Sequence, residues 1–501
     1  MAELLDLSYE AIYAQRDALD PSTGRIEEIA DGIAVCSGLR DARINDAVVL
    51  GDEIPGIVLK LDEDRVGVGL LATGELAEGA EARLLGTALS AAVSTEIAGR
   101  VLDSAGAPLD GLPAPTTGTT VPVFAPSPAL NTIEGVSRPL ATGLLAVDAV
   151  TPVGRGQRQL ILGDRQTGKT QLAIDAIINQ RSQDVICLYV SIGKKMAEVA
   201  SIVSHLRVAG ALDYTTVIAA PADATLTSQY VAPYYGMAVA EALRAAGKDV
   251  LVVFDDLTNH ADAYRSISLL LRRPPGREAY PGDIFYIHGS LLERAAQLSA
   301  EHGGGSITAL PVVTTLSDDL SAYIPTNIVS ITDGQIYLRA ELANQGRMPA
   351  IDIGLSVSRV GSDAQLPVIS QLSKGISFTL SQFAELQELL MYDGALSEHQ
   401  RSLVADGQAL VELFKQPAGA PRDPATTVFM LWAFRAGAFE GCSAADAAVL
   451  TGSLVAAAER NAADLAALLA PQLVPGGART FSEQQTASLT ELLDLARAAV
   501  S

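Results

Sequence analysis

A phosphate-binding loop is the part of this sequence with the clearest chemistry. The pattern Gly-x-x-x-x-Gly-Lys-Thr occupies positions 163 to 170, as Gly163, Asp164, Arg165, Gln166, Thr167, Gly168, Lys169 and Thr170. In such a loop the backbone amides surround a polyphosphate, the lysine reaches the terminal phosphates and the hydroxyl serves a magnesium ion. The pattern therefore predicts a nucleotide-binding site.

The residues on either side of the loop have the patterns of the elements that must position it. An apolar run of strand type, Gln159–Leu162, precedes the loop, and Gln171–Ile178, which has helical spacing, follows it. The N-terminus of that helix adds partial positive charge facing a bound phosphate. A chance glycine-rich turn would not need this strand–loop–helix setting, so we favour the phosphate loop.

Two carboxylates, Asp255 and Asp256, end the apolar strand expected at Val250–Phe254. An aspartate at the carboxyl end of a strand beside a phosphate loop can hold Mg²⁺, usually through water. An ordinary helix cap is the alternative, and for an isolated Asp-Asp pair it would be preferred. Because the pair accompanies Lys169 and Thr170, we predict a Mg²⁺ site formed by Thr170 and, through water, by Asp255. Asp256 is expected to be a cap or a supporting residue.

Composition and charge narrow the class of protein. At 501 residues, 49% of them apolar, the chain is long enough for about two to four domains. Its net charge of −23 argues against a general nucleic-acid binder, because phosphate backbones are bound by clustered lysine and arginine. Three widely spaced cysteines and five histidines without ligand spacing indicate neither a disulfide framework nor a structural metal. The acidic start lacks the positive region of a secretory signal, and no apolar run is long enough to span a membrane.

The distribution of turns and apolar runs predicts a multidomain protein. We expect an N-terminal helical segment at 1–23, a β-barrel at 24–94, an α/β nucleotide-binding domain at 95–371 and a helical domain at 372–501. Short apolar runs separated by Asp-Gly and Gly-Asp pairs are typical of a small barrel. The runs Val185–Val190 and Thr216–Ala220 predict further buried strands of a mainly parallel sheet. A C-terminal helical bundle is expected to end in a helix that begins near Ser482, where Ser482 and Gln485 form a capping-box pattern.

Longer motifs surround the phosphate loop. They are Gly154–Arg158, Leu269–Asp283, Leu291–Ala296, Ser321–Asn327 and Gly354–Ser362. With these motifs and the Asp-Arg-Gln-Thr of its loop, the chain resembles the α subunit of F-type ATP synthases rather than the catalytic β subunit. The resemblance is dense from Thr151 to Ser362, and weak before Gly99 and after Phe414.

This resemblance implies a RecA-like nucleotide-binding domain between the barrel and the helical bundle. It implies ATP or ADP with Mg²⁺ as the ligand, and a ring in which the chain alternates with β subunits around the γ rotor stalk. Further implied partners are the peripheral stalk subunits, with no nucleic acid and with membrane contact only through the ion-conducting sector. The expected location is peripheral, on the cytoplasmic face of a bacterial-type inner or plasma membrane. The complex would couple transmembrane ion flow to ATP synthesis or hydrolysis.

The resemblance implies that β subunits are catalytic and that the site of this chain is not, and two residues bear on that difference. Catalytic β subunits have a water-polarising glutamate after the strand that follows the loop helix, and the matching position here is Lys194, which cannot act as that carboxylate. Arg359 matches the α-subunit arginine that reaches the neighbouring β nucleotide and stabilises the charge of the transition state. Without the family, an arginine at this position would be taken for an interface salt-bridge residue. We expect a non-catalytic nucleotide site in this chain and Arg359 as an arginine finger in trans.

The base pocket and the N-terminus depart from the family pattern. Lys194 replaces a usual glutamine and could contact a phosphate or alter nucleotide affinity. Met348 replaces an arginine near the base. Of the two glutamines in the family's base-contacting pattern Lys-Gln-x-Gln, only Gln416 is kept, because Ala418 stands at the position of the second. We expect Gln416 to contact the nucleotide. The segment Met1–Leu19 is short and acidic for a stalk-binding helix, and these departures together suggest a divergent or alternative branch.

Two other functions remain open on the sequence. A self-sufficient hexameric P-loop NTPase, such as a secretion motor or an RNA translocase, needs its own catalytic glutamate, and Lys194 occupies that place. A ring protein that has lost its ATP chemistry would not need to keep Lys169, Thr170, Asp255 and Arg359.

Overall fold

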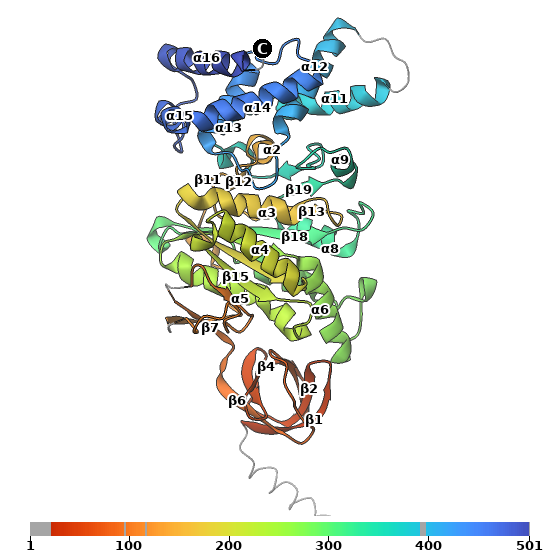
Figure 1. Ribbon diagram of the computed structural model, residues 1–501. Helices are drawn as coiled ribbons and strands as arrows, with labels where there is room; N and C mark the ends of the chain where they lie inside the picture. Colours follow the sequence, from red (N-terminus) through yellow and green to blue (C-terminus); the bar gives the residue numbers. More distant parts are fainter. Residues whose placement is uncertain (1–21, 95–96, 116–117, 391–396, 500–501) are drawn as a thin grey trace, which may run out of the picture.

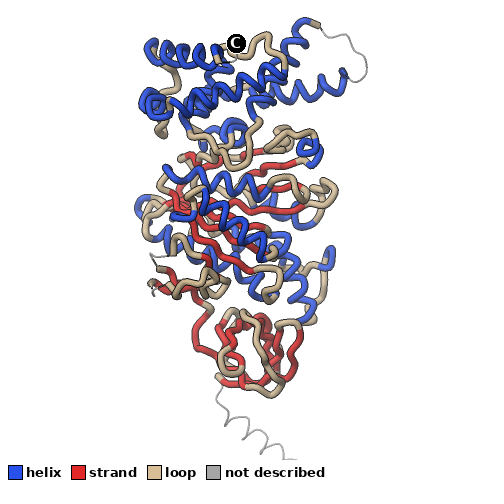
Figure 2. Tube along the Cα trace, viewed as in Figure 1, coloured by secondary structure: helices blue, strands red, loops and turns tan. Residues whose placement is uncertain are grey.

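The computed structural model describes residues 22–94, 97–115, 118–390 and 397–499. In these residues three bodies follow one another along the molecule: a β-barrel, an α/β domain and a helical domain (Figure 1). Strands dominate the barrel, helices and strands are mixed in the α/β domain, and helices dominate the third body (Figure 2). The predicted architecture is therefore confirmed. The helix predicted within residues 1–23 lies almost wholly outside the described residues.

Six antiparallel strands close the barrel in the order β1-β2-β5-β4-β3-β6. They are β1 (Thr23–Ala30), β2 (Ile33–Gly38), β3 (Asp46–Leu50), β4 (Ile54–Leu61), β5 (Arg65–Leu70) and β6 (Glu81–Ala88). The turn between β1 and β2 places Asp31 and Gly32 at positive φ, which the predicted Asp-Gly pair accommodates. Inward-facing side chains such as Ile26, Val48 and Val68 fill the interior. The pairing of β1 with β6 closes the barrel around this core.

The α/β domain is built on a mainly parallel sheet of order β20-β19-β13-β18-β16-β14-β15-β8, in which only the β19–β20 pair of this path is antiparallel. Its strands are β8 (Val101–Leu102), β13 (Leu160–Gly163), β14 (Val185–Ile192), β15 (Thr215–Ala220), β16 (Asp249–Asp255), β18 (Ser306–Thr314), β19 (Gly334–Leu338) and β20 (Val357–Ser358). The strands predicted from apolar runs are all present. Shorter strands are β7 (Ser90–Val93) paired with β9 (Thr119–Pro122), β10 (Ile133–Glu134) with β17 (Gln297–Leu298), and β11 (Pro139–Leu140) with β12 (Val153–Gly154).

Helices cover both faces of this sheet, so its strands are apolar on both sides. Along β16, Leu251 and Val253 belong to the core shared with α3 (Lys169–Ile178) and α4 (Met196–Val208). The alternate residues Val250 and Val252 belong to the core shared with α5 (Leu226–Ala245) and α6 (Leu257–Leu270). The remaining helices of the domain are α2 (Leu145–Val150), α7 (Ile284–Leu292), α8 (Tyr323–Ile331) and α9 (Ala340–Asn344).

The helical domain starts at α10, which includes the predicted boundary between 371 and 372. Its helices are α10 (Pro367–Ser373), α11 (Ile376–Leu390), α12 (Glu398–Phe414), α13 (Pro424–Arg435), α14 (Ala444–Arg460), α15 (Ala462–Leu469) and α16 (Glu483–Ala498). Capping boxes begin α12, α14 and α16, and the one predicted at Ser482 and Gln485 is confirmed. The apolar core beneath α3 continues without a break into this domain, for instance through Phe429 and Leu454.

In the part of the protein that the structure describes, no helix is both long and apolar enough to cross a membrane.

Candidate nucleotide site

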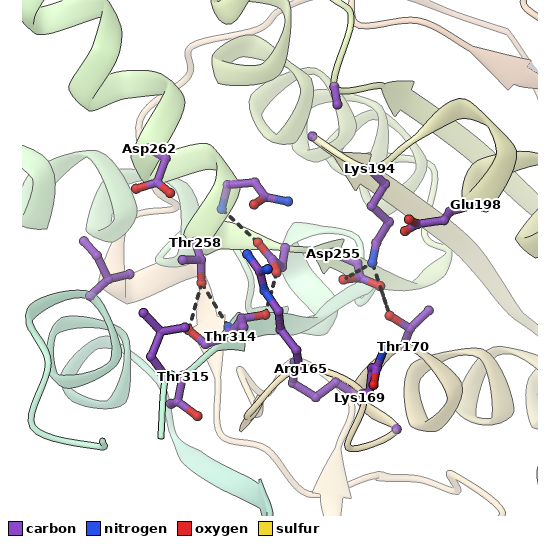
Figure 3. Close-up of a pocket in the computed structure, with 18 of the residues that line it drawn as sticks. Arg165, Lys169, Thr170, Lys194, Glu198, Asp255, Thr258, Asp262, Thr314 and Thr315 are labelled. Atoms are coloured by element: carbon purple, nitrogen blue, oxygen red, sulfur yellow. Dashed lines mark hydrogen bonds and ion pairs between the residues drawn. The ribbon is translucent and has the colours of Figure 1, made fainter. Parts of the chain in front are cut away.

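A cavity of about 1130 Å³ opens where β13, β14, β16 and β18 end, at the carboxyl edge of the parallel sheet. Ligands of α/β folds bind at this edge, because the loops that leave the strands converge there. The cavity is lined by five residues of the predicted loop, namely Arg165, Gln166, Gly168, Lys169 and Thr170, and also by Lys194, Asp255 and Asp256. Figure 3 shows the side chains of Thr170, Lys194 and Asp255 reaching the cavity from separate segments of the protein.

Asp164 and Thr167, which do not line the cavity, stabilise the loop through hydrogen bonds. The carboxylate of Asp164 accepts hydrogen bonds from the Thr315 hydroxyl (2.6 Å) and from the Asp318 amide (3.0 Å). The Thr167 hydroxyl donates to the Asp164 carbonyl at 2.9 Å. Asp164 therefore ties the phosphate loop to the segment that follows β18, a role that its place in the motif does not reveal.

The loop conformation depends on two glycines. Gly163 has φ 153° and Gly168 has φ 97°, values in the region that favours glycine. A Cβ at Gly163 would overlap the Leu338 carbonyl oxygen of the neighbouring strand β19. Gly168 is the N-cap of α3, so the amides of the first helical turn face the cavity.

Gly163→Ala is expected to weaken nucleotide binding by about ten- to a hundredfold, because relieving the contact with Leu338 displaces the loop amides. The measurement is titration of the purified protein with a fluorescent ATP analogue. Gly452→Ala, in α14 with open space around the new methyl group, is the matched control. Unchanged affinity in Gly163→Ala would show that this backbone position does not shape the site.

The Lys169 side chain bonds to backbone carbonyls of the phosphate loop itself. Its Nζ donates to the carbonyl oxygens of Gly163 (2.9 Å) and Asp164 (2.6 Å), and the side chain is largely buried. Burial lowers the pKa of this amine, and the nearby negative charges of Asp256 and Asp255 oppose that effect. The Lys169 ammonium is thus held beside the loop amides, so a bound polyphosphate would contact the ammonium and the amides together.

Asp255 is the centre of a buried polar cluster. Its Oδ2 accepts hydrogen bonds from the Thr170 hydroxyl and from the Tyr189 hydroxyl, both at 2.7 Å. The Lys194 Nζ lies 3.0 Å from Asp255 Oδ1 and also donates to Thr170 Oγ1 at 3.3 Å. Burial, followed by the charge of Asp255, raises the pKa of Tyr189 well above its usual value, so the phenol remains a donor.

These contacts bear on the predicted magnesium site. The Thr170 hydroxyl and the Asp255 carboxylate are hard oxygen donors of the kind that Mg²⁺ prefers. The donor chemistry therefore suits the ion, but the Lys194 ammonium contacts both donors (Figure 3). A divalent cation and an ammonium repel each other at such short range, so both cannot occupy this position.

Asp256 is a helix cap, as predicted. It precedes α6 and accepts hydrogen bonds from the Asn259 amide and the Thr314 hydroxyl, each at 2.8 Å. Burial, with the charge of Asp255 as a second cause, raises the pKa of its carboxyl. Both carboxylates beside the loop are thus already engaged by side chains or backbone.

Two predicted site residues lie outside this cavity. Arg359 follows β20, at the edge of the sheet, where its side chain is exposed and donates one hydrogen bond to the Val329 carbonyl at 3.2 Å. Gln416 is buried where the nucleotide and helical domains meet, and its side-chain amide bonds to backbone groups. It donates to the carbonyls of Gly143 and Ala420, both at 2.7 Å, and accepts from the Leu145 amide at 3.3 Å.

The contacts around Gln416 extend to the phosphate loop and its helix. The backbone N–H of Gln416 donates to the Met348 carbonyl at 2.8 Å, and the Met348 methyl group lies 3.1 Å from the point where a Cβ on Gly168 would be. A second contact runs from the Gly419 amide to the Asp175 carboxylate of α3, at 2.9 Å. The predicted contact between Gln416 and the nucleotide base stays a prediction.

Comparison with known proteins agrees with this architecture. Residues 143–358 match the model of the nucleotide-binding domain of the ATP synthase alpha/beta family, and residues 365–492 match that of the C-terminal domain of the same family. ATP synthase subunit alpha 1 of Listeria monocytogenes serotype 4b is 53% identical over 415 residues, 83% of this protein and 83% of that one. ATP synthase subunit alpha of Mycoplasma pneumoniae is 45% identical over 411 residues, 82% of this protein and 79% of that one.

Proposed function

Because the chain belongs to the ATP synthase alpha-subunit family, we propose that it is the non-catalytic, nucleotide-binding subunit of a rotary ATP synthase. In this proposal it alternates with catalytic β subunits in a ring and regulates them, while its own site binds ATP or ADP without turning it over. The ring couples transmembrane ion flow to ATP synthesis or hydrolysis.

The observation that carries the non-catalytic assignment is the contact between Lys194 and Asp255. Hydrolysis requires a group that orients or deprotonates the attacking water. Lys194 stands where the catalytic relatives place a glutamate, and its positive charge is directed at the carboxylate beside the loop. Asp255 and Asp256 are each already engaged by hydrogen-bond donors.

The position of Arg359 supports its role in trans. The side chain is exposed and outside the protein's own cavity, so it is free to meet a nucleotide held by a neighbouring subunit. A guanidinium supplied in this way stabilises the charge that develops on the phosphoryl oxygens. The nucleotide bound by this subunit itself would lie on the loop amides and Lys169. Thr170 and Asp255 are the residues that would hold Mg²⁺, if Lys194 moved away from them.

The remaining parts of the proposal follow the family. The partners are the β subunit, the γ rotor stalk and the peripheral stalk subunits, and the complex meets the membrane through its ion-conducting sector. The protein is placed on the cytoplasmic face of a bacterial-type inner or plasma membrane as a peripheral subunit. The coupling ion is chosen by residues of other subunits.

Affinity purification of the tagged protein from its host tests this function. We expect an equal amount of a β-like subunit together with stalk subunits, and ATP hydrolysis by that complex. The subunit purified alone is expected to bind ATP without hydrolysing it. A ring of this subunit alone that hydrolyses ATP would overturn the proposal in favour of a self-sufficient motor.

A further inference from the structure

Lys194 holds the position that a metal ion would need in this site. Its ammonium contacts the two predicted magnesium ligands, at 3.0 Å from Asp255 Oδ1 and 3.3 Å from Thr170 Oγ1. The Lys194 side chain is only 15% exposed and that of Asp255 only 1%. The ion pair is therefore part of the cavity wall rather than a solvated surface contact.

The backbone on either side of Lys194 keeps the side chain at this position. The Gly193 amide donates to the Ala220 carbonyl at 2.8 Å, and the Lys194 carbonyl accepts from the Ala222 amide at 2.9 Å. Both bonds join the end of β14 to the end of the adjacent parallel strand β15. The backbone of Lys194 is thus anchored at the sheet edge, within reach of Asp255 for its side chain.

An ammonium can do part of what a metal ion does for a bound polyphosphate. It carries three N–H donors, two of which are accounted for by the contacts with Asp255 and Thr170. The third N–H can donate to a phosphate oxygen. The Lys194 ammonium would then neutralise the buried Asp255 carboxylate and also bridge that carboxylate to the bound polyphosphate. Charge-assisted hydrogen bonds of this kind are among the strong ones.

We propose that Lys194 is a tethered cation that replaces Mg²⁺ in this subunit, so that its site binds nucleoside di- and triphosphates free of metal. This inference rests on the proposed nucleotide binding and specifies the form of the ligand. A divalent ion would have to displace the ammonium from Asp255 and would leave it close to a second positive charge. Metal-free nucleotide instead completes the cluster already formed by Lys194, Asp255 and Thr170.

The experiment measures ATP affinity of the purified full-length protein with Mg²⁺ and with excess EDTA. We expect the two dissociation constants of the wild-type protein to agree within about threefold. Lys194→Gln removes the tethered charge and leaves Asp255 without its counter-charge. In that variant EDTA is expected to weaken ATP binding by about ten- to a hundredfold relative to Mg²⁺.

Two further variants separate this role from general charge effects. Lys248→Gln removes the charge of an exposed lysine that does not line the cavity and is expected to behave as the wild type does. Lys194→Arg keeps a positive charge and is expected to retain tight binding in EDTA. A wild-type protein that requires Mg²⁺ for tight binding would overturn the inference while leaving nucleotide binding intact. No ATP binding in either condition would overturn the proposed nucleotide function as well.

Discussion

Arg359→Ala is expected to lower ATP hydrolysis by the assembled complex by about a thousandfold or more, the range typical of an arginine supplied in trans. Among the residues that the structure describes, the Arg359 side chain bonds only to the Val329 carbonyl, so its removal should leave the fold intact. Nucleotide binding to the subunit's own cavity should not change, because Arg359 is not among the residues that line it. The measurement is the steady-state hydrolysis rate of complexes purified with each variant.

Arg339→Ala is the matched control for this experiment. Arg339 is also a partly exposed arginine, paired with Asp352 at 3.2 Å, and its loss should leave the rate nearly unchanged. Arg359→Lys should remain strongly impaired, because an ammonium lacks the planar fork that spans two phosphoryl oxygens. A complete complex that carries Arg359→Ala and retains a rate within tenfold of wild type would remove Arg359 from the catalytic machinery.

Glu241→Ala should produce a large loss of stability in the nucleotide domain. Arg294 is fully buried, and its Nε and Nη2 donate to the two oxygens of Glu241 at 3.0 and 2.5 Å. Arg244, also buried, lies 3.7 Å from the same carboxylate. Removal of Glu241 leaves two buried guanidinium groups without a counter-charge, which costs about 3–5 kcal/mol.

Thermal unfolding of the purified protein measures this effect. A loss of that size should lower the unfolding midpoint of the domain by about 10 °C. Arg65→Ala breaks exposed ion pairs with Glu27 and Glu28 in the barrel and should change the stability by less than about 1 kcal/mol. The double change Glu241→Leu with Arg294→Met should recover only part of the loss, because it removes the stranded charge of Arg294 but leaves the buried Arg244 without its counter-charge. A midpoint unchanged in Glu241→Ala would contradict the expected cost of the unpaired arginines.

The sequence predicted those parts of the fold that depend on local patterns. Apolar runs such as Val250–Phe254 become strands because both of their faces are covered, and alternate residues enter the two cores. The helix start at Ser482 follows from a cap that involves only Gln485, three residues away. Domain boundaries are harder to place, because α10 forms a continuous packed element across the predicted division at 371.

The sequence motif predicted where the site lies, but it did not predict most of the side-chain contacts within the site. The loop and Asp255 converge because parallel strands end at one edge, which the sequence pattern implies. The contacts of Asp255 with Tyr189 and Lys194 depend on the register of β14 against β16, in which Ser191 pairs with Asp255. No single-sequence signal gives that register. Gln416 was predicted from a family pattern, whereas the orientation of its amide is decided by three backbone groups that are distant in sequence or lie across a loop.

The joint formed by Gln416 has a mechanical consequence. Its amide joins the segment after α12 to the turn before α2, its backbone holds Met348 beside Gly168, and Gly419 is bonded to Asp175 of the loop helix. The apolar core is also continuous across the two domains. A hinge between them would have to break several buried bonds at once. We therefore expect a displacement of the helical domain to be passed to the phosphate loop through these contacts.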